Sequence, residues 1–515
     1  MLTDTVDNYT EDLEKTGRRL FPIYLTILVI SPFPLGANRP WAWSILAIVA
    51  FSLLAYYFLQ TSRGKVRIPD INIKLKLVCF CLFLWVLYQI VLVVPLPIET
   101  VKLLSPMTID ALSSSGSLIA SKEFISISID KITSINELIK SSLYVCIFLL
   151  TILLVRSKDR LRNLFIAIVV AGVLQAVIGL TIAFLDQSVM RGVIGQEYHS
   201  AVSGTFVNRN HFAGFMNLTI AASIGLILSV GIREKRQIHR ESHKHPWQSR
   251  LLDWRIYMMG YCLIMVFALL FSQSRGAWVS FSVMVVIGFM LLSLVRIKVF
   301  SVLDNYTMPI LIVVGAILVG GADVLVNRMS DIGVHLTSRM DIWQNSWLLL
   351  LDSWQTGIGP GNFQYAYPIY ASGYSHSLNV NIAHAHNDYL ELLIEQGIVG
   401  FSLLGIVIFT SIRTALSSIK EERDVKKNAF AIASLLGISG LMVHSFLDFN
   451  FQIPSNSLYF FTLLAVACMQ GLKSLHVEDR DIAWEESMFK DSISENSQVV
   501  SQANISHKRR KKHFN

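Results

Sequence analysis

Long runs of apolar residues, separated by short polar stretches, are the dominant pattern along the chain. A helix that spans a bilayer needs roughly 17–25 mostly apolar residues. Because every backbone group in lipid has to be satisfied within its own segment, such runs predict helices. The pattern predicts an all-α fold, a polytopic membrane helix bundle of about twelve transmembrane helices. The runs cover residues 20–36, 41–59, 75–95, 138–155, 163–185, 211–231, 256–272, 276–295, 307–322, 390–412, 429–446 and 456–472.

The basic residues between these runs predict which side of the membrane each loop faces. Lys and Arg are enriched in cytoplasmic loops. With twelve spans, loops rich in Lys and Arg alternate strictly with loops that are poor in them, which places both termini in the cytoplasm. The basic loops hold Arg63, Lys65, Arg67, Lys74, Lys76, Arg156, Lys158, Arg160, Arg162, Arg233, Lys235, Arg236, Arg240, Lys244, Arg250, Arg255, Arg296, Lys298, Arg413, Lys420, Arg423, Lys426 and Lys427.

The predicted organisation is a short cytoplasmic N-terminus over residues 1–19, a transmembrane domain over residues 20–472 and a basic cytoplasmic tail over residues 473–515. The longest loop on the opposite face, residues 323–389, is rich in aromatic residues, Gly and polar residues, and loops of that length are usually functional. Within it, the spacing of Met340, Trp343, Trp347 and Leu351 predicts an amphipathic helix over residues 338–351 that lies in the membrane interface.

Composition supports lipid as the main surroundings of the chain. Hydrophobic residues make up 53% of its 515 residues and charged residues only 16%, against about 25% in soluble proteins. The net charge of +8 sits mainly in the short loops, which favours a role in membrane orientation over nucleic-acid binding. The five cysteines all lie in apolar runs and are expected to be small buried hydrophobes, without a disulfide or a zinc site.

Two arginines do not fit the charge rule because they fall on the side predicted to face away from the cytoplasm. Arg209 stands where the sixth run begins, beside Asn208, and Arg275 stands in a turn of about four residues between the seventh and eighth runs. Arginine suits a diphosphate because its planar fork donates two parallel hydrogen bonds and stays charged. A snorkelling or carboxylate-paired arginine is the alternative for each one alone. Together they favour an anion site.

A histidine motif, His384-Ala385-His386-Asn387-Asp388, stands at the mouth of the tenth run. Asn387 or Asp388 is expected to cap that helix and so fix His386 at its first turn. A histidine titrates near neutral pH and accepts a proton from an attacking hydroxyl. A purely structural histidine at the helix start is the alternative, and metal binding through His384, His386 and Asp388 is a weaker one.

Three further features complete the candidate site. Asp448, at the outer end of the eleventh run, is on the predicted side of both arginines, where it would orient one of them or the histidine, bind the acceptor sugar, or form a simple interfacial salt bridge. Arg339, on the loop helix, is a further anion contact. The glycine-rich segment 357–361 lacks the Lys of a phosphate-binding loop and predicts a tight turn that lets backbones approach closely.

These motifs together resemble the O-antigen ligase family, which also includes O-antigen and exopolysaccharide polymerases. The most specific element is His386-Asn387, nine further residues, and then Gly397-Ile398-Val399-Gly400; Phe401 follows where ligases often have Gly, Thr or Tyr. The stretches 204–214, 274–277 and 444–449 are also similar to the family's. The resemblance covers about residues 160–470.

The resemblance implies a glycosyltransferase of the bacterial inner membrane whose active site faces the periplasm. It implies an undecaprenyl-diphosphate-linked glycan donor, a lipid A core or glycan acceptor, and no cofactor or metal. On this chain, it implies His386, Arg275 and Arg209 as catalytic residues and Asp448 as the late acidic residue. Arg339, Asn387, Asp448 and Asn208 are the expected substrate-binding residues. Ligation of O-antigen to lipid A core is the first expectation, repeat-unit polymerisation the alternative, and a solute transporter a second alternative.

Overall fold

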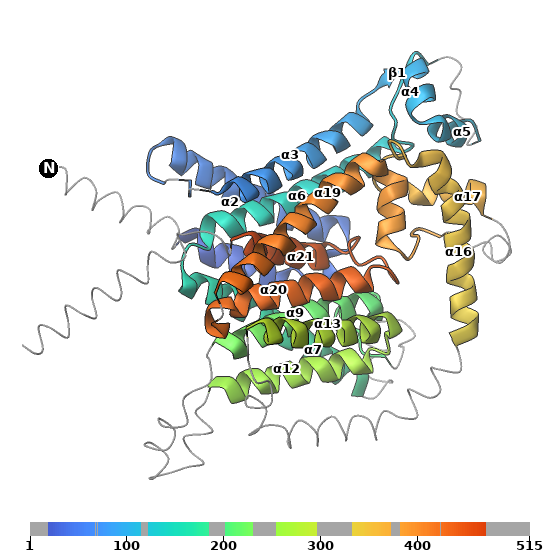
Figure 1. Ribbon diagram of the computed structural model, residues 1–515. Helices are drawn as coiled ribbons and strands as arrows, with labels where there is room; N and C mark the ends of the chain where they lie inside the picture. The colour runs from blue at the N-terminus through green and yellow to red at the C-terminus, as the bar shows by residue number, and fades with distance from the viewer. Residues whose placement is uncertain are drawn as a thin grey trace, which may run out of the picture.

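The computed structural model describes residues 19–66, 68–69, 71–114, 122–184, 201–229, 254–295, 332–371, 382–422 and 424–469. This part of the chain is almost entirely helical, which confirms the all-α fold. Figure 1 shows the long helices lying side by side in one bundle. They are the helix Arg19–Ile30, α2 (Pro40–Ser62), α3 (Ile73–Val93), α6 (Lys131–Leu154), α7 (Lys158–Phe184), α9 (Arg209–Ser229), α12 (Trp254–Phe271), α13 (Arg275–Leu294), α19 (Asp388–Glu421), α20 (Val425–His444) and α21 (Pro454–Met469).

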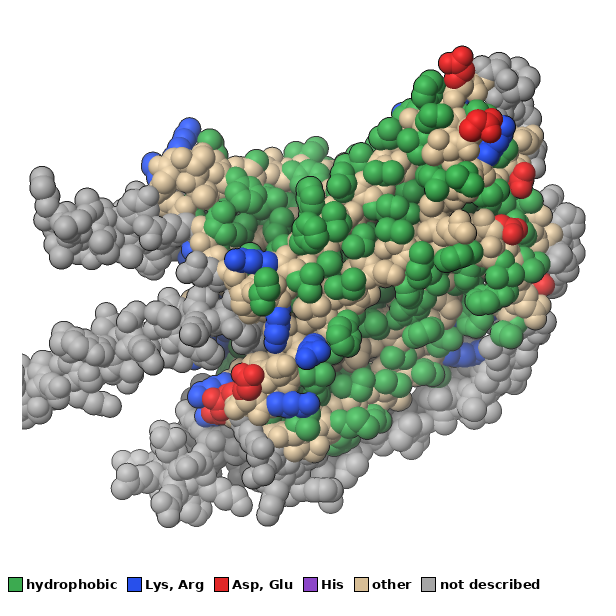
Figure 2. Space-filling view, turned by 45° about the horizontal axis from the view of Figure 1, so that its top comes forward, with side chains coloured by type: hydrophobic (Ala, Val, Ile, Leu, Met, Phe, Trp, Pro, Cys, Tyr) green, Lys and Arg blue, Asp and Glu red, His purple; other side chains and the backbone are tan. Residues whose placement is uncertain are grey.

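Eleven of the twelve predicted runs therefore contain a helix, and the run at 307–322 lies outside the described residues. Eight of the described helices are long and apolar enough to cross a membrane, and three apolar helices are shorter. The latter are the helix Arg19–Ile30, α21 and the apolar part of α12. The space-filling view in Figure 2 shows hydrophobic side chains over much of the bundle, and Lys and Arg gathered mainly towards its left end.

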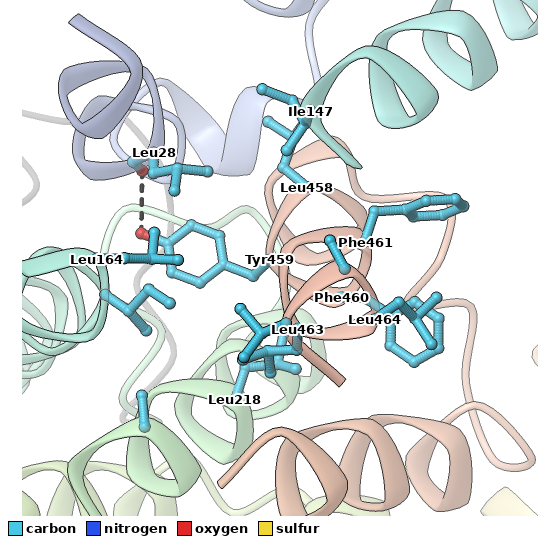
Figure 3. Close-up of a cluster of buried hydrophobic side chains, with 14 of the residues drawn as sticks. Leu28, Ile147, Leu164, Leu218, Leu458, Tyr459, Phe460, Phe461, Leu463 and Leu464 are labelled. Atoms are coloured by element: carbon cyan, nitrogen blue, oxygen red, sulfur yellow. Dashed lines mark hydrogen bonds between the residues drawn. The ribbon is translucent and has the colours of Figure 1, made fainter. Parts of the chain in front are cut away.

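The core of the bundle is built around α9, α20 and α21, the helices that turn most of their residues inward. Helix α9 packs against α7, α12 and α20, while α21 packs against α6, α19 and α20. Figure 3 shows Tyr459 of α21 among buried leucines; its hydroxyl donates to the backbone oxygen of Leu28 at 2.9 Å. This bond satisfies a buried polar group in an apolar core, where an unpaired hydroxyl would be costly.

A smaller unit, the covering unit, lies over the right-hand end of the bundle in Figure 1. It contains the strands β1 (Leu96–Pro97) and β2 (Phe124–Ile125), which pair antiparallel, and four helices. These are α4 (Ile98–Leu104), α5 (Pro106–Ser114), α16 (Ile332–Ser353) and α17 (Phe363–Tyr370). Its apolar side chains, among them Met107, Leu349 and Phe363, form a separate cluster together with Ile394 of α19.

Helix α16 runs across the ends of the bundle helices (Figure 1). It contains the whole predicted amphipathic segment, so the predicted helix is confirmed and extends further at its N-terminal end. Met340, Trp347 and Leu351 are exposed, whereas Leu349 on the opposite side is buried. Its position in a membrane interface stays a prediction.

The glycine-rich segment forms the expected tight turn, placed against α19. Gly357, Gly359 and Gly361 all have positive φ. A Cβ at Gly357 would lie 2.3 Å from the backbone oxygen of Glu395, and the amide of Gly359 donates to that same oxygen at 2.9 Å. Only glycine allows this approach, so the turn fixes the covering unit on α19.

Candidate functional site

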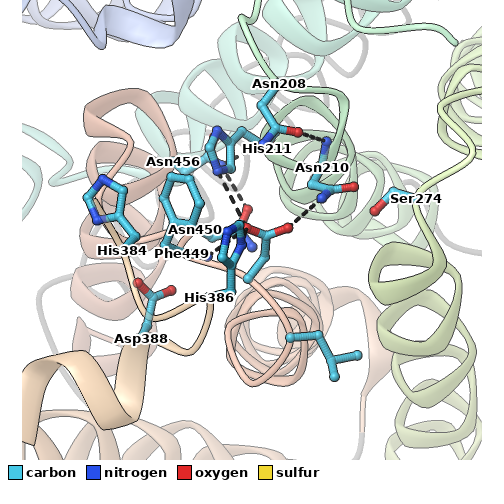
Figure 4. Close-up of polar contacts among 12 residues, drawn as sticks. Asn208, Asn210, His211, Ser274, His384, His386, Asp388, Phe449, Asn450 and Asn456 are labelled. Atoms are coloured by element: carbon cyan, nitrogen blue, oxygen red, sulfur yellow. Dashed lines mark hydrogen bonds and ion pairs between the residues drawn. The ribbon is translucent and has the colours of Figure 1, made fainter. Parts of the chain in front are cut away.

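The candidate site lies where the beginnings of α9, α13 and α19 meet the loop between α20 and α21. Figure 4 shows residues from these elements converging: Asn210 and His211 from α9, Ser274 before α13, His384 and His386 before α19, and Phe449 from the α20–α21 loop. Residues that are far apart in the sequence thus share one end of the bundle, beneath the covering unit.

Asp448 is the centre of this arrangement. Its side chain is 1% exposed. Oδ2 accepts a hydrogen bond from Nδ2 of Asn210 and lies 3.4 Å from Nη2 of Arg339. Oδ1 lies 3.3 Å from Nδ1 of His386 and 3.8 Å from Nε2 of His211, and accepts from its neighbour's backbone amide at 2.9 Å. One carboxylate therefore holds groups from α9, α16 and the histidine motif.

These partners decide the charge of Asp448. Burial alone would raise its pKa, but the hydrogen bonds and charges of His211 and His386 hold the pKa well below its usual range. The group is therefore a carboxylate at neutral pH. A buried carboxylate beside histidines fixes the direction of their rings.

His386 is held by the backbone as well as by Asp448. Its φ of 51° lies in the left-handed region, which few non-glycine residues adopt. The next residue, Asn387, caps α19: its Oδ1 accepts from the amides of Tyr389 at 3.1 Å and Leu390 at 3.2 Å. The predicted cap is confirmed, and it turns the chain so that His386 faces Asp448.

His384 has a different carboxylate partner. Its Nδ1 lies 2.8 Å from Oε1 of Glu391, whose Oε2 accepts from the amide of Ala385 at 2.8 Å. Burial would lower the pKa of His384, but the charge and hydrogen bond of Glu391 raise it above its ordinary value of 6.5. The ring stacks on Phe449 with centroids 4.2 Å apart, and His386 and His211 meet the same ring edge-on.

Arg209 and Arg275 are the first residues of α9 and α13. Each is followed by a residue that contacts the site: Asn210 donates to Asp448, and Gly276 lies against the ring of His444. Ser274 caps α13, and Asn208 accepts from the amide of Asn210 at 2.8 Å, so both helix starts are fixed. Both arginines thus lie at the end of the bundle that holds His386.

Arg339 reaches the site from α16. Its Nη1 donates to the backbone oxygen of Leu447 at 2.6 Å while Nη2 pairs with Asp448. Nearby on the same helix, Nε1 of Trp343 donates to the backbone oxygen of Ala385 at 3.0 Å. Helix α16 is therefore attached both to the histidine motif and to the α20–α21 loop.

Two glycines allow the elements of the site to come together. A Cβ at Gly214 of α9 would lie 2.2 Å from Oδ1 of Asn450, and a Cβ at Gly276 would lie 2.9 Å from Cδ2 of His444. The two nitrogens of His444 are buried and have no hydrogen-bond partner among the described residues. His444 and Asn450 are thus further buried polar side chains that pack against the starts of α9 and α13.

The arrangement does not gather His384, His386 and Asp388 as one ligand set. The two histidines pair with different carboxylates, and Asp388 accepts from the amide of Phe451 at 3.1 Å instead. Within the described ranges, no group of three or more His, Cys, Asp or Glu side chains is placed to hold a metal ion.

Several members of the site were not singled out in the sequence. They are Asn210, His211, Glu391 and Phe449, which contact either Asp448 or the histidine motif. The contact of Glu391 could have been predicted from the sequence. Glu391 stands one turn into the helix that begins shortly after His384, and its side chain can reach back past the N-cap residue to that histidine. Asn210 and His211 meet Asp448 only through the tertiary fold.

Comparison with known families gives a match to part of the chain. The model of the O-antigen ligase family matches residues 260–405, a range that runs from α12 through α16 to α19 and contains Arg275, Arg339 and His386. This match confirms the resemblance to that family. No curated protein matches the chain.

Proposed function

We propose that this protein, with its O-antigen ligase match, transfers a glycan from undecaprenyl diphosphate to an acceptor hydroxyl on the periplasmic side of the bacterial inner membrane. The observation that carries the proposal is the convergence of His386, Asp448 and Arg339 with the helix starts that bear Arg209 and Arg275. A base, a carboxylate that orients it and cations for an anionic leaving group are the parts that such a transfer needs.

In the proposed reaction, Asp448 keeps a proton on Nδ1 of His386, which leaves Nε2 free to accept the proton of the acceptor hydroxyl. The hydroxyl oxygen forms a bond to the anomeric carbon while the bond between that carbon and the phosphate oxygen breaks. The electron pair of the broken bond stays on the diphosphate, and the anomeric centre is inverted in this single displacement. The proton ends on His386.

The arginines act on the leaving group. Arg209, Arg275 and Arg339 hold the diphosphate and stabilise the charge that grows on it as the bond breaks. Arginine performs this role better than lysine because two of its N–H groups bond to phosphate oxygens in parallel.

The test of this function uses purified protein, a lipid-diphosphate-linked glycan donor and a lipid acceptor. Arg275→Lys should fold as the wild type does and lower the transfer rate by about 10²–10³-fold, the usual cost of losing one preorganised donor. The matched control is Arg413→Lys, an exposed arginine towards the other end of α19, which should transfer at the wild-type rate. Full activity of Arg275→Lys would remove this arginine from the mechanism.

The acceptor is proposed to be lipid A core, which makes the protein an O-antigen ligase, with the lipid-linked repeat unit of a polymerase as the alternative. The histidine motif His386-Asn387 with Gly397 and Gly400 supports the ligase. Offering both acceptors to the same preparation separates the two: product on lipid A core supports ligation, and lengthening of the lipid-linked glycan alone supports polymerisation. Uptake of solute into proteoliposomes without glycan transfer would favour a transporter instead.

A further inference from the structure

A cavity of about 380 Å³ lies beside the candidate site, enclosed by α3, α6, α19, α20 and α21. Most of its lining is apolar and follows α19 from the end near the site deep into the bundle. The apolar lining includes Leu392, Phe401, Leu404, Ile408, Phe460 and Phe461. Gly405 and the exposed Phe409 also border the cavity, so part of its wall belongs to the surface of the bundle. A single hydrocarbon chain suits such a space.

The end of the cavity nearest the site is polar. Glu137, Asp388 and Glu395 line it together with Gln396 and Gln452. Asp388 is only 6% exposed, and its Oδ1 accepts no hydrogen bond from the described residues. Since buried polar atoms almost always have partners, this oxygen points to a ligand that brings a donor.

The lining residues indicate what kind of headgroup fits. They include carboxyl and amide groups but no Lys or Arg. The nearest cation on α6, Lys140, is already paired with Glu137. A phosphate would therefore lack a cation here. Carboxyl and amide groups suit hydroxyls, which both donate and accept hydrogen bonds.

Side-chain contacts connect the polar end of the cavity to the candidate site. Gln452 lines the cavity, and its Nε2 donates to Oε1 of Glu391 at 3.0 Å, the oxygen that also holds His384. Asp388 lines the cavity, and His386, two residues earlier, faces Asp448. The cavity and the arginine side therefore flank the histidine motif.

We propose that this cavity binds an amphiphile with one apolar chain in the bundle and an uncharged, hydroxyl-rich headgroup against Asp388, Glu395 and Gln452. This binding does not rest on the proposed function. The two sides of the histidine motif differ in chemistry: the arginines suit an anionic headgroup, and the carboxyl and amide groups suit an uncharged one.

The test uses the full chain in nanodiscs and two photoreactive probes with the same diazirine-bearing alkyl chain, one an alkyl glucoside and the other an alkyl phosphate. After irradiation, labelled peptides are mapped by mass spectrometry. The glucoside should label the 401–412 part of α19 about tenfold more than the phosphate does, a difference of about 1.4 kcal/mol in binding. Equal labelling by the phosphate probe, or loss of glucoside labelling when undecaprenyl diphosphate is added, would overturn the proposal.

Two glycines with open space around them provide the test variant and its control. A Cβ built on Gly405 meets nothing within 4 Å, and the same holds for Gly260 on α12, which does not line the cavity. Gly405→Phe should fill the cavity and reduce glucoside labelling about tenfold, and the smaller Gly405→Leu should reduce it as well. Gly260→Phe should label as the wild type does. Unchanged labelling in both Gly405 variants would refute the site.

Transfer activity is measured separately on the same preparations. If the glucoside labels the cavity as proposed but neither the wild type nor any variant transfers glycan, the binding site stands and the proposed function fails. If the wild type transfers glycan but the cavity is not labelled, the function stands and this site does not.

Discussion

At the scale of single residues, the most constrained group is the buried carboxylate of Asp448. A carboxylate out of water costs several kcal/mol unless partners compensate it. Asn210, Arg339, His386 and His211 provide that compensation from three different parts of the chain. The same contacts that satisfy Asp448 therefore set the positions of the groups around it.

His384 leads to a prediction on pH. Because Glu391 raises its pKa above the ordinary 6.5, the folded state binds the proton more tightly than the unfolded state does. The stabilisation is thus complete below about pH 6.5 and is lost as pH rises through the raised pKa. In detergent, the gap in unfolding temperature between wild type and His384→Gln should shrink steadily from pH 6 to pH 9.

Lys102→Gln is the control for this experiment, since it removes an exposed ion pair with Glu99 that involves no histidine. Its difference from wild type should stay constant. A gap for His384→Gln that does not depend on pH would mean that the ion pair with Glu391 does not stabilise the fold.

His386, Asn387 and Asp448 could be named from the sequence as site residues, but most of their partners could not. Asn387 was predictable because a helix cap is a local feature. Asp448 was placed on the same predicted side as both arginines, yet its contacts to His386, Arg339 and Asn210 join residues 62, 109 and 238 positions apart in the sequence. Local sequence patterns do not predict contacts between residues that are so far apart along the chain. The catalytic and binding roles of these residues stay predictions.

At the scale of elements, α19 is the helix that connects the site, the covering unit and the cavity. It is interrupted at Gly397, where φ is 58° and ψ is −169°. The interruption lets the turn at Gly357 approach: the amide of Ile398 donates to the backbone oxygen of Trp354 at 2.7 Å. The first turns of α19 are therefore joined to the covering unit, and the remainder to the bundle.

Gly397→Ala should destabilise the protein. The φ/ψ region of Gly397 is nearly restricted to glycine and costs other residues about 1–3 kcal/mol, and a Cβ would lie 2.4 Å from the backbone oxygen of Gln355. The expected result is a lower unfolding temperature and weaker protection of residues 354–358 in hydrogen exchange.

Gly405→Ala is the matched control on the same helix, because its Cβ meets nothing within 4 Å. It should be neutral or slightly stabilising, since alanine favours a helix over glycine by up to about 1 kcal/mol. Equal effects of the two substitutions would show that the break at Gly397 carries no special constraint.

The hydrophobic pattern alone does not predict where a helix begins. The apolar run at 138–155 predicted a helix of that extent, but α6 begins at Lys131 because Asp130 accepts hydrogen bonds from the amides of Ile132 and Thr133. Its first two turns are polar and belong to the side of the covering unit. The apolar pattern identifies the part that is suited to lipid, while the capping residue decides where the helix starts.

At the scale of the whole molecule, the described residues form one bundle with a covering unit over the end that holds the candidate site. The bundle was predictable because each apolar run specifies its helix locally. The covering unit was predicted only as a long functional loop with one helix, since its cluster combines Met107, Leu349, Phe363 and Ile394 from distant segments. The sides of the membrane stay a prediction from the distribution of Lys and Arg.

Cysteine labelling tests this sidedness. In a chain whose five native cysteines are replaced, Lys102→Cys and Lys420→Cys introduce exposed thiols at the covering unit and near the other end of α19. A membrane-impermeant maleimide should label Lys102→Cys in intact spheroplasts and Lys420→Cys only after permeabilisation. The reverse result would place the candidate site in the cytoplasm and contradict a periplasmic transfer.

The attachment of α16 has a consequence for the working cycle. Arg339 pairs with Asp448 and with the backbone oxygen of Leu447, and Trp343 of the same helix bonds to the backbone of the histidine motif. An arriving diphosphate that recruits Arg339 has to take it from Asp448. Binding and release of the diphosphate would then exchange the partner of one guanidinium and change how firmly α16 is attached to the candidate site.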